Sequence, residues 1–423
     1  MRYSRLFGKT VREAPKDETA ANAILLTRGG FVQKLGAGIY TLLPLGLRVV
    51  RKISQIVREE MDAIGGQEVL MPTLQPREVW EESGRWETLK GVMYQLKDSS
   101  DKDFGLGCTH EEIVIDVARH YIQSFRDLPQ YPYQIHTKFR DEPRPRSGLL
   151  RGREFMMKDL YSLHTDKRDL DDFYEICAEA YLKIFKRCGL DTVRTKASGG
   201  LFTKELTDEF QVISQAGEDE IIYCSGGDFS ENTEVAKVKE GKLCDLGHGP
   251  LKKVKAIEVG NIFKFGTYYS EKMGLYYTDK KGQKKPVYFG SYGVGITRTM
   301  AAAVEVYHDE RGIIWPETIA PYQAYLISIG DEGRVKREGD ALYEKLQKAG
   351  VEVLYDDRNA RLDSPQSRQG SAGEKFADAD LIGIPVRLVV SDKTPKGKVE
   401  WKERDKKETN IIALDQAVKN LFN

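Results

Sequence analysis

Five arginines fall within one short stretch of the chain, FRDEPRPRSGLLRGREFMMKD, which runs from Phe139 to Asp159. They are Arg140, Arg144, Arg146, Arg151 and Arg153. Each guanidinium presents a planar fork of donors that fits phosphate oxygens, so arginines held on a rigid support suit a polyphosphate ligand. The alternative is a solvated loop in which acidic neighbours such as Glu142 form ordinary ion pairs with them.

The elements that would position these arginines are two strands. Pro143, Pro145 and Gly148 mark the middle of the stretch as a loop. Apolar residues precede the loop and resume after it, at Phe155. This pattern predicts a hairpin with a long connecting loop.

Composition limits the classes of function. The chain has 423 residues, enough for two or three domains, and its 65 basic residues balance 65 acidic ones. Zero net charge argues against a surface built for sequence-independent DNA binding, but it leaves room for a local basic site. The sequence shows no signal-peptide pattern and no apolar run of membrane-spanning length, so we expect a cytoplasmic protein without a membrane partner.

The five cysteines are scattered along the chain, which predicts reduced thiols rather than a disulfide framework. Cys244 and His248, in CDLGHG, have the spacing of half a metal site. No C-x-x-C pair accompanies them, and this argues against a structural zinc. The lysine-rich stretch 237–255 is expected to be solvated surface.

Periodic patterns predict the elements around the arginine stretch. Apolar residues at helical spacing indicate helices over 45–64, from about 113 to 125, and over 169–187. QEVLMPTL reads as a strand, but Pro72 lacks an amide donor and places that strand at a sheet edge or an interface. The run 257–278 is expected to form strands.

A glycine-punctuated strand enters an alanine-rich helix at GSYGVGITRTMAAAVE, which begins at Gly290. Its glycines do not follow the spacing G-x-G-x-x-G, which argues against a dinucleotide-binding Rossmann site. Pro316 and Pro321 then mark a domain boundary. Beyond it, strand and helix patterns alternate, which predicts a compact α/β domain.

Three separated segments, namely the Pro72 strand after its helix, the arginine hairpin, and the glycine-rich strand-helix with Arg298, resemble motifs 1, 2 and 3 of the class II aminoacyl-tRNA synthetases. The resemblance is closest to the bacterial prolyl-tRNA synthetase family and covers nearly the whole chain. It rests on six stretches in the family's order: RGGFVQKLGAGIYTLLPLGLRV, VLMPTLQPREVWEESGRW, CTHEE, KFRDEPRPRSGLLRGREFMMKDLYSLH, GSYGVGITR and KFADADLIGIP.

The resemblance implies an α+β catalytic domain over 1–318, an antiparallel sheet flanked by helices, followed by a smaller α/β anticodon-binding domain over 319–423. The three motifs would span about 46–80, 133–162 and 288–308. A homodimer is implied, with the helix that ends at Gly66 and the Pro72 strand at the two-fold interface. Long bacterial members insert an editing domain between motifs 2 and 3, and the short segment 224–254 leaves no room for one here.

The implied activity joins proline to ATP as prolyl-adenylate, releases pyrophosphate, and then esterifies the terminal ribose of tRNA(Pro). By the family pattern, Arg140 contacts the α-phosphate and the amino-acid carboxylate, Glu142 accepts from the adenine amino group, and Phe155 stacks on the adenine ring. Arg151 and Arg298 would hold the outer phosphates. Arg140 and Arg298 are therefore the implied catalytic residues.

Three further residues complete the implied ATP site. Gly293 and Gly295 would let the backbone approach the nucleotide without a Cβ, whereas the alternative is a tight turn that serves only the fold. Glu258, in IEVGNIF, would bind the magnesium ion that accompanies ATP. For Arg298 taken alone, a surface ion pair is the simpler interpretation.

The family binds proline at CTHEE, and the carboxylate of Glu111 suits the two N–H donors of the proline ammonium. Thr109 and Glu112 also read as a capping box, which would leave Glu111 free. Phe263 is implied to line the pyrrolidine pocket, with plain core as the alternative. Ser291 stands where relatives often carry cysteine, so we expect altered pocket polarity with activity retained.

Candidates for tRNA contacts lie in two places. Arg144 and Arg146, at the hairpin tip, are candidates for the acceptor stem. Asp356, Arg358 and Lys375 are candidates for the anticodon, because carboxylates accept from the N–H donors of guanine and RNA loops are read on splayed bases. A charged, solvated face is the alternative for each of them.

Two other functions stay open. A sister class IIa enzyme, such as a threonyl or seryl enzyme, would share the motifs. A non-catalytic paralogue that binds tRNA, or that serves as a polymerase accessory subunit, would share the fold. The ATP set of Arg140, Glu142, Phe155 and Arg298 argues against the paralogue, because a binding module has no need for it.

Overall fold

The structure is a computed structural model that describes residues 1–200, 203, 205–330, 333–358 and 370–422. The chain forms two compact units. The larger consists of Gly36–Ile39 and Ile53–Ala302, and the smaller of Met1–Leu35, Tyr40–Lys52 and Ala303–Asn423. These limits differ from the expected division at residue 318, because N-terminal segments group with the C-terminal part. The domain limits 1–318 and 319–423 therefore stay a prediction.

Within the described residues, the larger unit is built on a nine-stranded sheet in the order β10-β9-β12-β11-β13-β16-β8-β7-β3. Its pairings are antiparallel except for β12 with β9 and β3 with β7. The strands are β3 (Gln67–Glu68), β7 (Pro132–Phe139), β8 (Glu154–His164), β9 (Thr192–Ser198), β10 (Leu206–Ile213), β11 (Asp219–Tyr223), β12 (Ser230–Asn232), β13 (Lys252–Gly266) and β16 (Tyr288–Gly295). The expected antiparallel sheet is confirmed.

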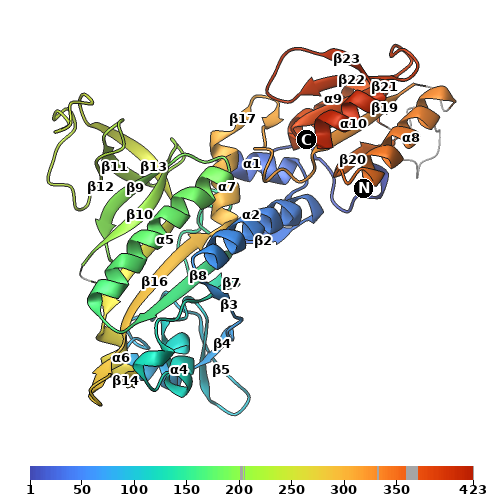
Figure 1. The fold of residues 1–423 in the computed structure, drawn as a ribbon. Helices are drawn as coiled ribbons and strands as arrows, with labels where there is room; N and C mark the ends of the chain where they lie inside the picture. Colours follow the sequence, from blue (N-terminus) through green and yellow to red (C-terminus); the bar gives the residue numbers. More distant parts are fainter. Residues whose placement is uncertain (201–202, 204, 331–332, 359–369, 423) are drawn as a thin grey trace. The chain divides into compact units, whose positions relative to one another are not determined.

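Helix α5 (Lys167–Arg187) covers one face of this sheet and contacts β8, β13 and β16 (Figure 1). It begins where the side chain of Asp166 accepts a hydrogen bond from the amide of Asp169, an N-cap that satisfies an otherwise unpaired donor. Short helices α3 (Arg77–Ser83), α4 (Glu111–Tyr121) and α6 (Tyr268–Met273) pack together beside a small sheet of β4 (Leu74–Pro76), β5 (Gln95–Lys97) and β6 (Asp103–Leu106).

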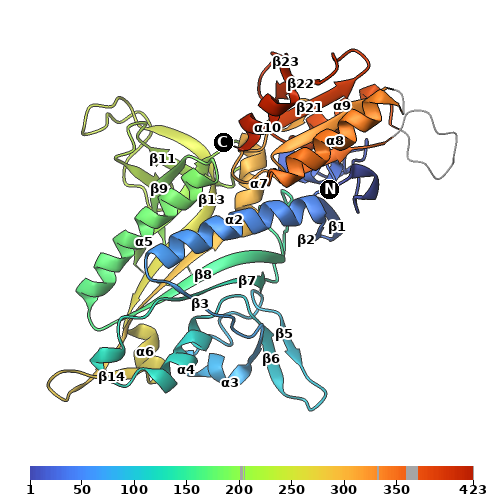
Figure 2. The ribbon, with the colours of Figure 1, turned by 45° about the vertical axis from the view of Figure 1, so that its right-hand side comes forward.

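The register of the central strands brings the three motif regions together. Strands β7 and β8 lie side by side (Figure 2), and the arginine stretch forms their hairpin as predicted. Phe139 is opposite Glu154 in the register of this pair. Strand β16 lies between β8 and β13, so that Ser291 is opposite Tyr161 on one side and Phe263 on the other. Residues far apart in sequence therefore share one surface of the sheet.

Most predicted helices are confirmed. Helix α2 spans Pro44–Ala63 and helix α7 spans Ile296–Val306, directly after β16. Helix α4 is shorter than expected, because the backbone turns to extended geometry at Ile122. The expectation of strands throughout 257–278 is wrong over Tyr268–Met273, which form α6 and end at Gly274 in the left-handed region.

The Pro72 segment is less regular than predicted. Only Gln67–Glu68 form a strand, β3, and it lies at the edge of the large sheet. The chain then leaves that sheet, and Leu74–Pro76 pair with β6 instead. The predicted edge position is confirmed. The Val69 amide still donates to the carbonyl of Tyr133, but the Met71 amide donates to the Gln134 side chain and Pro72 has no amide to offer.

In the smaller unit, the described residues include a five-stranded sheet in the order β20-β19-β21-β22-β23. Strand β19 pairs in parallel with β20 and β21, and the other pairings are antiparallel. The elements are β19 (Ala324–Ile329), α8 (Arg334–Lys348), β20 (Val353–Asp356), α9 (Ala372–Ile382), β21 (Val386–Ser391), β22 (Lys398–Glu403), β23 (Asn410–Ala413) and α10 (Leu414–Phe422). The predicted α/β domain is confirmed.

Among the residues described, no helix has both the length and the apolar character needed to cross a membrane.

Candidate functional site

A cavity of about 280 Å³ lies in the larger unit, over strands β8, β11, β13 and β16. Both Arg140 and Arg298 line it, together with Glu142, Arg151, Phe155, Glu258 and Gly295 from the predicted set. Gly293, Thr109, Glu111, Phe263 and Ser291 do not line this cavity. Arg140 and Arg298 are 158 positions apart in the sequence, and the sheet brings them to one cavity.

Arg140 is the cation best placed to meet a ligand. Its guanidinium carbon lies 5.2 Å from the centre of the Phe155 ring, so the side chain is held against an aromatic face. Throughout the described part of the chain, its guanidinium makes no hydrogen bond and no direct ion pair. Burial lowers the pKa of Arg140, and the neighbouring positive charge of Arg298 lowers it further. An anion entering the cavity would relieve both effects.

Arg298 is held by the strand beside it. Its Nε donates to the carbonyl of Leu150 at 2.9 Å, and its terminal nitrogen donates to the carbonyl and the carboxylate of Glu258 at 2.9 and 3.1 Å. The Glu258 carboxylate also accepts from Asn261 at 2.8 Å. A Cβ on Gly293 would lie only 2.8 Å from the Asn261 side chain, so this glycine makes room for the residue that orients Glu258.

The remaining motif arginines form a network at the rim of the cavity. Arg151 donates to Glu142 at 2.8 Å and to Glu218 at 2.7 Å, and Arg146 also pairs with Glu218. Burial would raise the pKa of Glu142, but the hydrogen bond from Arg151 outweighs it and the pKa is lowered. Arg144 is exposed, and within the described residues its guanidinium forms no ion pair.

Sequence reasoning missed two acidic residues beside Glu258. Glu209 on β10 and Asp219 on β11 both accept from the amide of Gln211, at 2.8 and 3.0 Å. Burial and the nearby charge of Glu258 raise the pKa of Glu209 to about 8, and burial raises that of Asp219 as well. These two carboxylates therefore add acidic character next to Glu258. No motif pointed to them, because strand register alone brings them together.

Glu111 lies in a buried network that links two of the motif regions. Its carboxylate accepts from Thr109 at 2.6 Å and from Ser291 of β16 at 3.0 Å. Arg85 lies 3.3 Å from Glu111 and 3.0 Å from Glu112. The structure therefore brings Thr109, Glu111 and Ser291 together, as the resemblance implies for a proline site.

The capping-box prediction is wrong. The N-cap of α4 is His110, without a side-chain capping bond, and the Thr109 hydroxyl donates to Glu111 instead. Glu112 turns inward, where it accepts from Arg85 and from Ser83. Burial raises the pKa of Glu112 to about 7 in spite of the Arg85 charge. The Glu112 carboxylate is therefore a buried hydrogen-bond acceptor and not a cap of the helix N-terminus. The expectation that Glu111 stays free is also wrong, because its carboxylate accepts hydrogen bonds from Thr109 and Ser291.

A second buried network lies beneath the site. Lys138 Nζ lies 2.8 Å from both Asp159 and the Nδ1 of His110, and Tyr161 donates to Asp159 at 2.8 Å. Burial, with the Lys138 charge as a second cause, lowers the pKa of His110 to about 3, and His110 is therefore neutral. Its Nδ1 can then accept from Lys138 while its Nε2 donates to the carbonyl of Pro72.

Phe263 packs in the hydrophobic core, stacked on Phe265 with ring centres 5.9 Å apart. Its place opposite Ser291 keeps it near the Glu111 network. A role in the pyrrolidine pocket stays a prediction.

The three anticodon candidates also come together, in the smaller unit. Arg358 donates to Asp356 and to Asp378, the latter at 2.7 Å. Lys375 is buried and donates to the carbonyl of Ser328 at 2.7 Å. These charges bind one another inside the domain, and their contact with an anticodon stays a prediction.

Comparison with known proteins agrees with this architecture in both units. Residues 94–307 match the family model described as "tRNA synthetase class II core domain (G, H, P, S and T)", and residues 323–422 match "Anticodon binding domain". The chain is therefore a class II aminoacyl-tRNA synthetase core followed by an anticodon-binding domain.

Curated relatives indicate which class II synthetase family the chain belongs to. A proline--tRNA ligase of Anaeromyxobacter sp. (strain Fw109-5) is 36% identical over 572 residues, covering 99% of this chain and 98% of the relative. One of Dehalococcoides mccartyi (strain CBDB1) is 34% identical, covering 100% of this chain and 98% of the relative. The chain belongs to the proline--tRNA ligase family. The first alignment exceeds the 423 residues of this chain by at least 149 positions, so that relative contains a large segment without a counterpart here.

Solved structures agree in fold. The prolyl-tRNA synthetase of Cryptosporidium parvum, complexed with halofuginone and AMPPNP, superposes with a TM-score of 0.76 at 17% identity, covering 95% of this chain and 77% of that one. The Giardia lamblia prolyl-tRNA synthetase in complex with prolyl-adenylate gives 0.75 at 17% identity, covering 94% and 75%.

Proposed function

We propose that this chain is a proline–tRNA ligase, which activates proline with ATP and transfers it to tRNA(Pro). One observation carries the proposal: Arg140 and Arg298 line a single cavity, and the guanidinium of Arg140 is left for a ligand. Family membership supports the same activity through relatives named proline--tRNA ligase.

The first step joins two anions. A carboxylate oxygen of proline forms a bond to the α-phosphorus of ATP, and the bond from that phosphorus to the β-phosphate oxygen breaks and releases pyrophosphate. Arg140 would bind both the carboxylate and the α-phosphate and stabilise the charge that grows between them. Arg298 and Arg151 would hold the outer phosphates, while Phe155 and Glu142 would position the adenine.

Magnesium is a further part of the proposal. Glu258 would hold the ion, and the nearby carboxylates of Glu209 and Asp219 would add negative charge that favours a cation there. A bound ion would neutralise phosphate charge, and it would also lower the mutual repulsion that raises the pKa of Glu209. The Arg298–Glu258 pair would have to loosen when ATP binds.

Proline recognition would centre on Glu111. The secondary ammonium of proline has two N–H donors, and the Glu111 carboxylate, oriented by Thr109 and Ser291, can accept them. Ser291 in place of cysteine adds a hydrogen bond to that carboxylate. The hydroxyl therefore adjusts the polarity of the pocket without removing its charge.

In the second step, the terminal ribose hydroxyl of tRNA attacks the carbonyl carbon of prolyl-adenylate, and AMP leaves. The phosphate of the adenylate would take the hydroxyl proton and leave with AMP. Arg144, exposed at the hairpin tip, would contact the acceptor stem, with Arg146 beside it. Asp356, Arg358 and Lys375 are proposed for the anticodon end, either in direct contact or as the support for residues that touch it.

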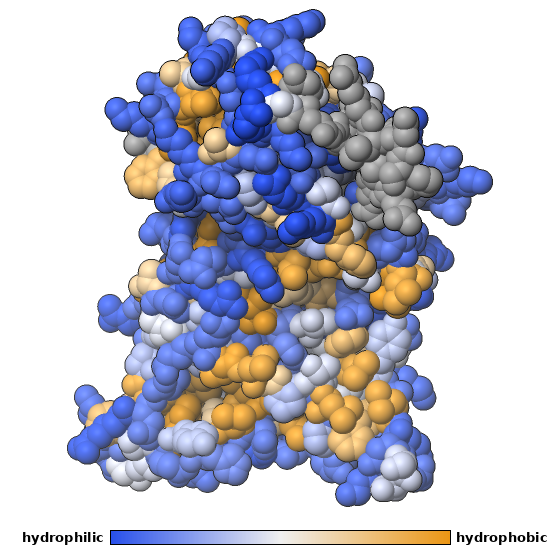
Figure 3. All heavy atoms as spheres, turned by 90° about the vertical axis from the view of Figure 1, so that its right-hand side faces the viewer, coloured by the Kyte–Doolittle hydropathy of each residue, from blue (hydrophilic) through white to orange (hydrophobic). Residues whose placement is uncertain are grey.

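We further propose a homodimer that works in the cytoplasm, where charged tRNA is used. Val69, Leu70 and Leu74 follow the edge strand β3 and are exposed by 40, 75 and 48%. Figure 3 shows apolar side chains gathered on the lower part of the face that this region occupies. Exposed apolar residues beside a sheet edge are suited to an isologous interface.

No editing domain is proposed, because the connection between β11 and β13, where such an insertion is expected, contains only the short strand β12 and turns. Purified enzyme should therefore not deacylate alanyl-tRNA(Pro) faster than buffer does. Faster deacylation would show an editing activity that this account does not contain.

Amino-acid-dependent exchange of pyrophosphate into ATP tests the activity. We expect exchange with proline and not with threonine or serine. Exchange with threonine or serine would favour a sister enzyme. No exchange with any amino acid, in protein that binds tRNA, would favour the non-catalytic paralogue.

A further inference from the structure

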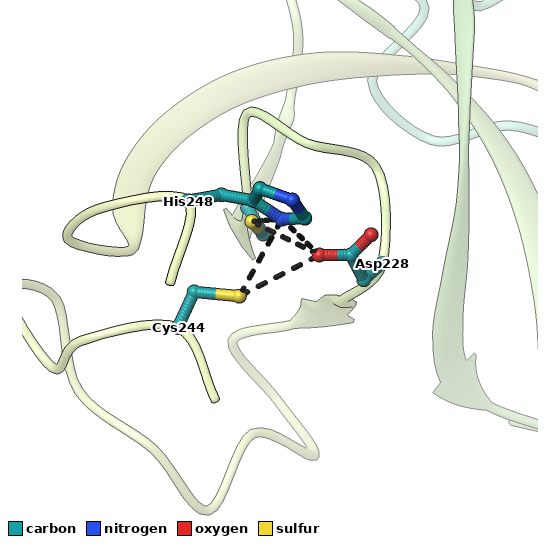
Figure 4. A group of neighbouring side chains, drawn as sticks. Asp228, Cys244 and His248 are labelled. Carbon is teal, nitrogen blue, oxygen red and sulfur yellow. Dashed lines mark hydrogen bonds and ion pairs between the residues drawn. The ribbon is translucent and has the colours of Figure 1, made fainter. Parts of the chain in front are cut away.

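The connection between β11 and β13 carries a second cluster of reactive side chains. Cys224 follows β11 directly, Asp228 lies four residues later, and Cys244 and His248 lie further along the same connection. One ligand atom from each of the four lies within 4.8 Å of the others. Figure 4 shows Asp228, Cys244 and His248 pointing toward one common point.

The distances suit a tetrahedral ion. The Asp228 carboxylate oxygen lies 3.7 Å from Cys224 Sγ and 3.6 Å from Cys244 Sγ. His248 Nδ1 lies 3.8 and 4.0 Å from the same two sulfurs, and it contacts the Asp228 oxygen directly. Ligands about 2.0–2.3 Å from a tetrahedral zinc stand roughly 3.3–3.8 Å apart, so small side-chain shifts would complete the site.

Two equivalent backbone turns present the four ligands. In Cys224-Ser-Gly-Gly-Asp228, the Gly227 amide donates to the Cys224 carbonyl, and the Cys224 amide donates to the carbonyl of Phe229. Cys244-Asp-Leu-Gly-His248 repeats the arrangement, because Gly247 donates to Cys244, and Cys244 donates to Gly249. Gly227 and Gly247 both adopt positive φ, at 86° and 80°. Each turn thus offers a thiol at its first residue and a second ligand four positions on.

A backbone donor faces one of the two sulfurs. The Gly226 amide lies 3.4 Å from Cys224 Sγ, and such a donor stabilises negative charge on sulfur. A Cβ on Gly226 would lie 2.3 Å from His248 Nδ1, so glycine is what lets the imidazole reach the cluster. Both cysteines are buried, while His248 and Asp228 stay partly exposed, which leaves a path for an ion to enter.

The segment has little else to hold it together. Its own hydrophobic cluster has four buried residues in the described chain, and two of them are Cys224 and Cys244; the others are Ile222 and Leu251. The segment between the two strands contains one short strand, β12, and otherwise turns. Small modules with so little core usually require a metal or a disulfide.

We propose that Cys224, Asp228, Cys244 and His248 bind one Zn²⁺ ion as a structural site. Two thiolates exclude Mg²⁺ and Ca²⁺ as the preferred ions, and a closed set of four protein ligands leaves no open position for catalysis. The sequence spacing argued against zinc because no C-x-x-C occurs. The second half of the site, Cys224 and Asp228, became visible only once β11 and β13 were paired.

The proposed zinc site lies at one end of the paired strands β11 and β13, and the other end of this pair lines the proposed ATP cavity. Tyr223 pairs with Lys252 next to the cluster, and Asp219 pairs with Ala256 at the cavity. These two pairs are about 13 Å apart along the strands. Zinc would therefore fix the ends of the two strands that carry Asp219 and Glu258, without touching the nucleotide.

The test is the metal content of the full chain, purified with its thiols kept reduced and supplied with zinc alone. We expect about one zinc per chain. Cys244→Ser, Asp228→Asn and His248→Ala should each lower retention against a chelator by more than about tenfold. Cys188→Ala is the matched thiol control and Asp245→Asn the matched carboxylate control in the same loop, and both should retain zinc.

A second measurement covers the case in which the cysteine variant does not fold. Cobalt added to the metal-free wild type should give the visible absorption of a tetrahedral site and a thiolate-to-cobalt band, and both should change in Asp228→Asn and His248→Ala. The proposal is overturned if folded, reduced protein takes up less than about a tenth of an equivalent of zinc. It is equally overturned if the ligand variants retain zinc as the controls do, or if mass spectrometry of protein alkylated at lysis finds a Cys224–Cys244 disulfide.

Discussion

Replacing Arg140 with glutamine separates a catalytic role from a structural one. The guanidinium lies against Phe155 and, across the described residues, forms no direct ion pair, so its charge is available to the reacting groups. Removing one donor aimed at developing charge typically costs about 3 kcal/mol, which is about a hundredfold or more in rate. We therefore expect Arg140→Gln to lower kcat for proline-dependent pyrophosphate exchange by about 10²–10³-fold, with a smaller change in KM for ATP.

The effect on stability should have the opposite sign. Burial and Arg298 already lower the pKa of Arg140, which means that the fold disfavours its charge. A neutral glutamine removes that unfavourable interaction and leaves no directly paired carboxylate behind. The Tm of Arg140→Gln should therefore equal or exceed that of the wild type.

Two variants serve as comparisons. Arg140→Lys keeps the charge but loses the planar fork, so its rate should lie between those of wild type and Arg140→Gln. Arg144→Gln, exposed on the same hairpin, should leave exchange unchanged. Exchange by Arg140→Gln within about threefold of wild type, or a fall in Tm that accounts for the lost activity, would refute the reasoning.

Three further predictions rest on other parts of the site. Arg144→Gln should weaken aminoacylation of tRNA(Pro) while sparing exchange, because its guanidinium faces solvent and not the cavity; equal loss in both assays would exclude an acceptor-stem role. Ser291→Ala should raise KM for proline about tenfold, because Glu111 loses one of its hydrogen bonds, whereas Ser291→Cys should remain active; an unchanged KM in Ser291→Ala would show that this bond does not orient the carboxylate. His110 contributes stability that is present above its unfolded pKa of 6.5 and is lost as pH falls toward about 3, because the unfolded state then binds the extra proton. Between pH 7 and pH 5 this amounts to about 2 kcal/mol of unfolding free energy, so denaturant titrations of His110→Gln should show a shallower pH dependence than wild type, while exposed His120→Gln should match wild type.

The sequence predicted helices and strands correctly where the apolar residues follow a single helical or strand periodicity. The β7–β8 hairpin and the β16–α7 junction follow from proline, glycine and apolar spacing that point to one structure. Tyr268–Met273 were misread, because a short aromatic run fits a strand or one helical turn equally well, and only the capping glycine at 274 distinguishes them.

The sequence predicted only some of the residues of the candidate site. Arg140, Phe155 and Arg298 were reached through motifs, and the sheet then placed them at one cavity. Glu209, Asp219 and Arg85 carry no local signal, because their roles arise from strand register and from burial. Thr109 fits a capping pattern in the sequence, but in the structure its hydroxyl donates to the buried carboxylate of Glu111 instead.

The central claim is that Arg140 and Arg298 bind one ATP molecule beside proline. A crystal structure of the chain with proline and a non-hydrolysable ATP analogue tests it most directly. The account predicts the adenine on Phe155, the α-phosphate at Arg140 and the outer phosphates near Arg298, with the proline ammonium at Glu111. A nucleotide bound outside this cavity, or a triphosphate that meets neither arginine, would contradict it.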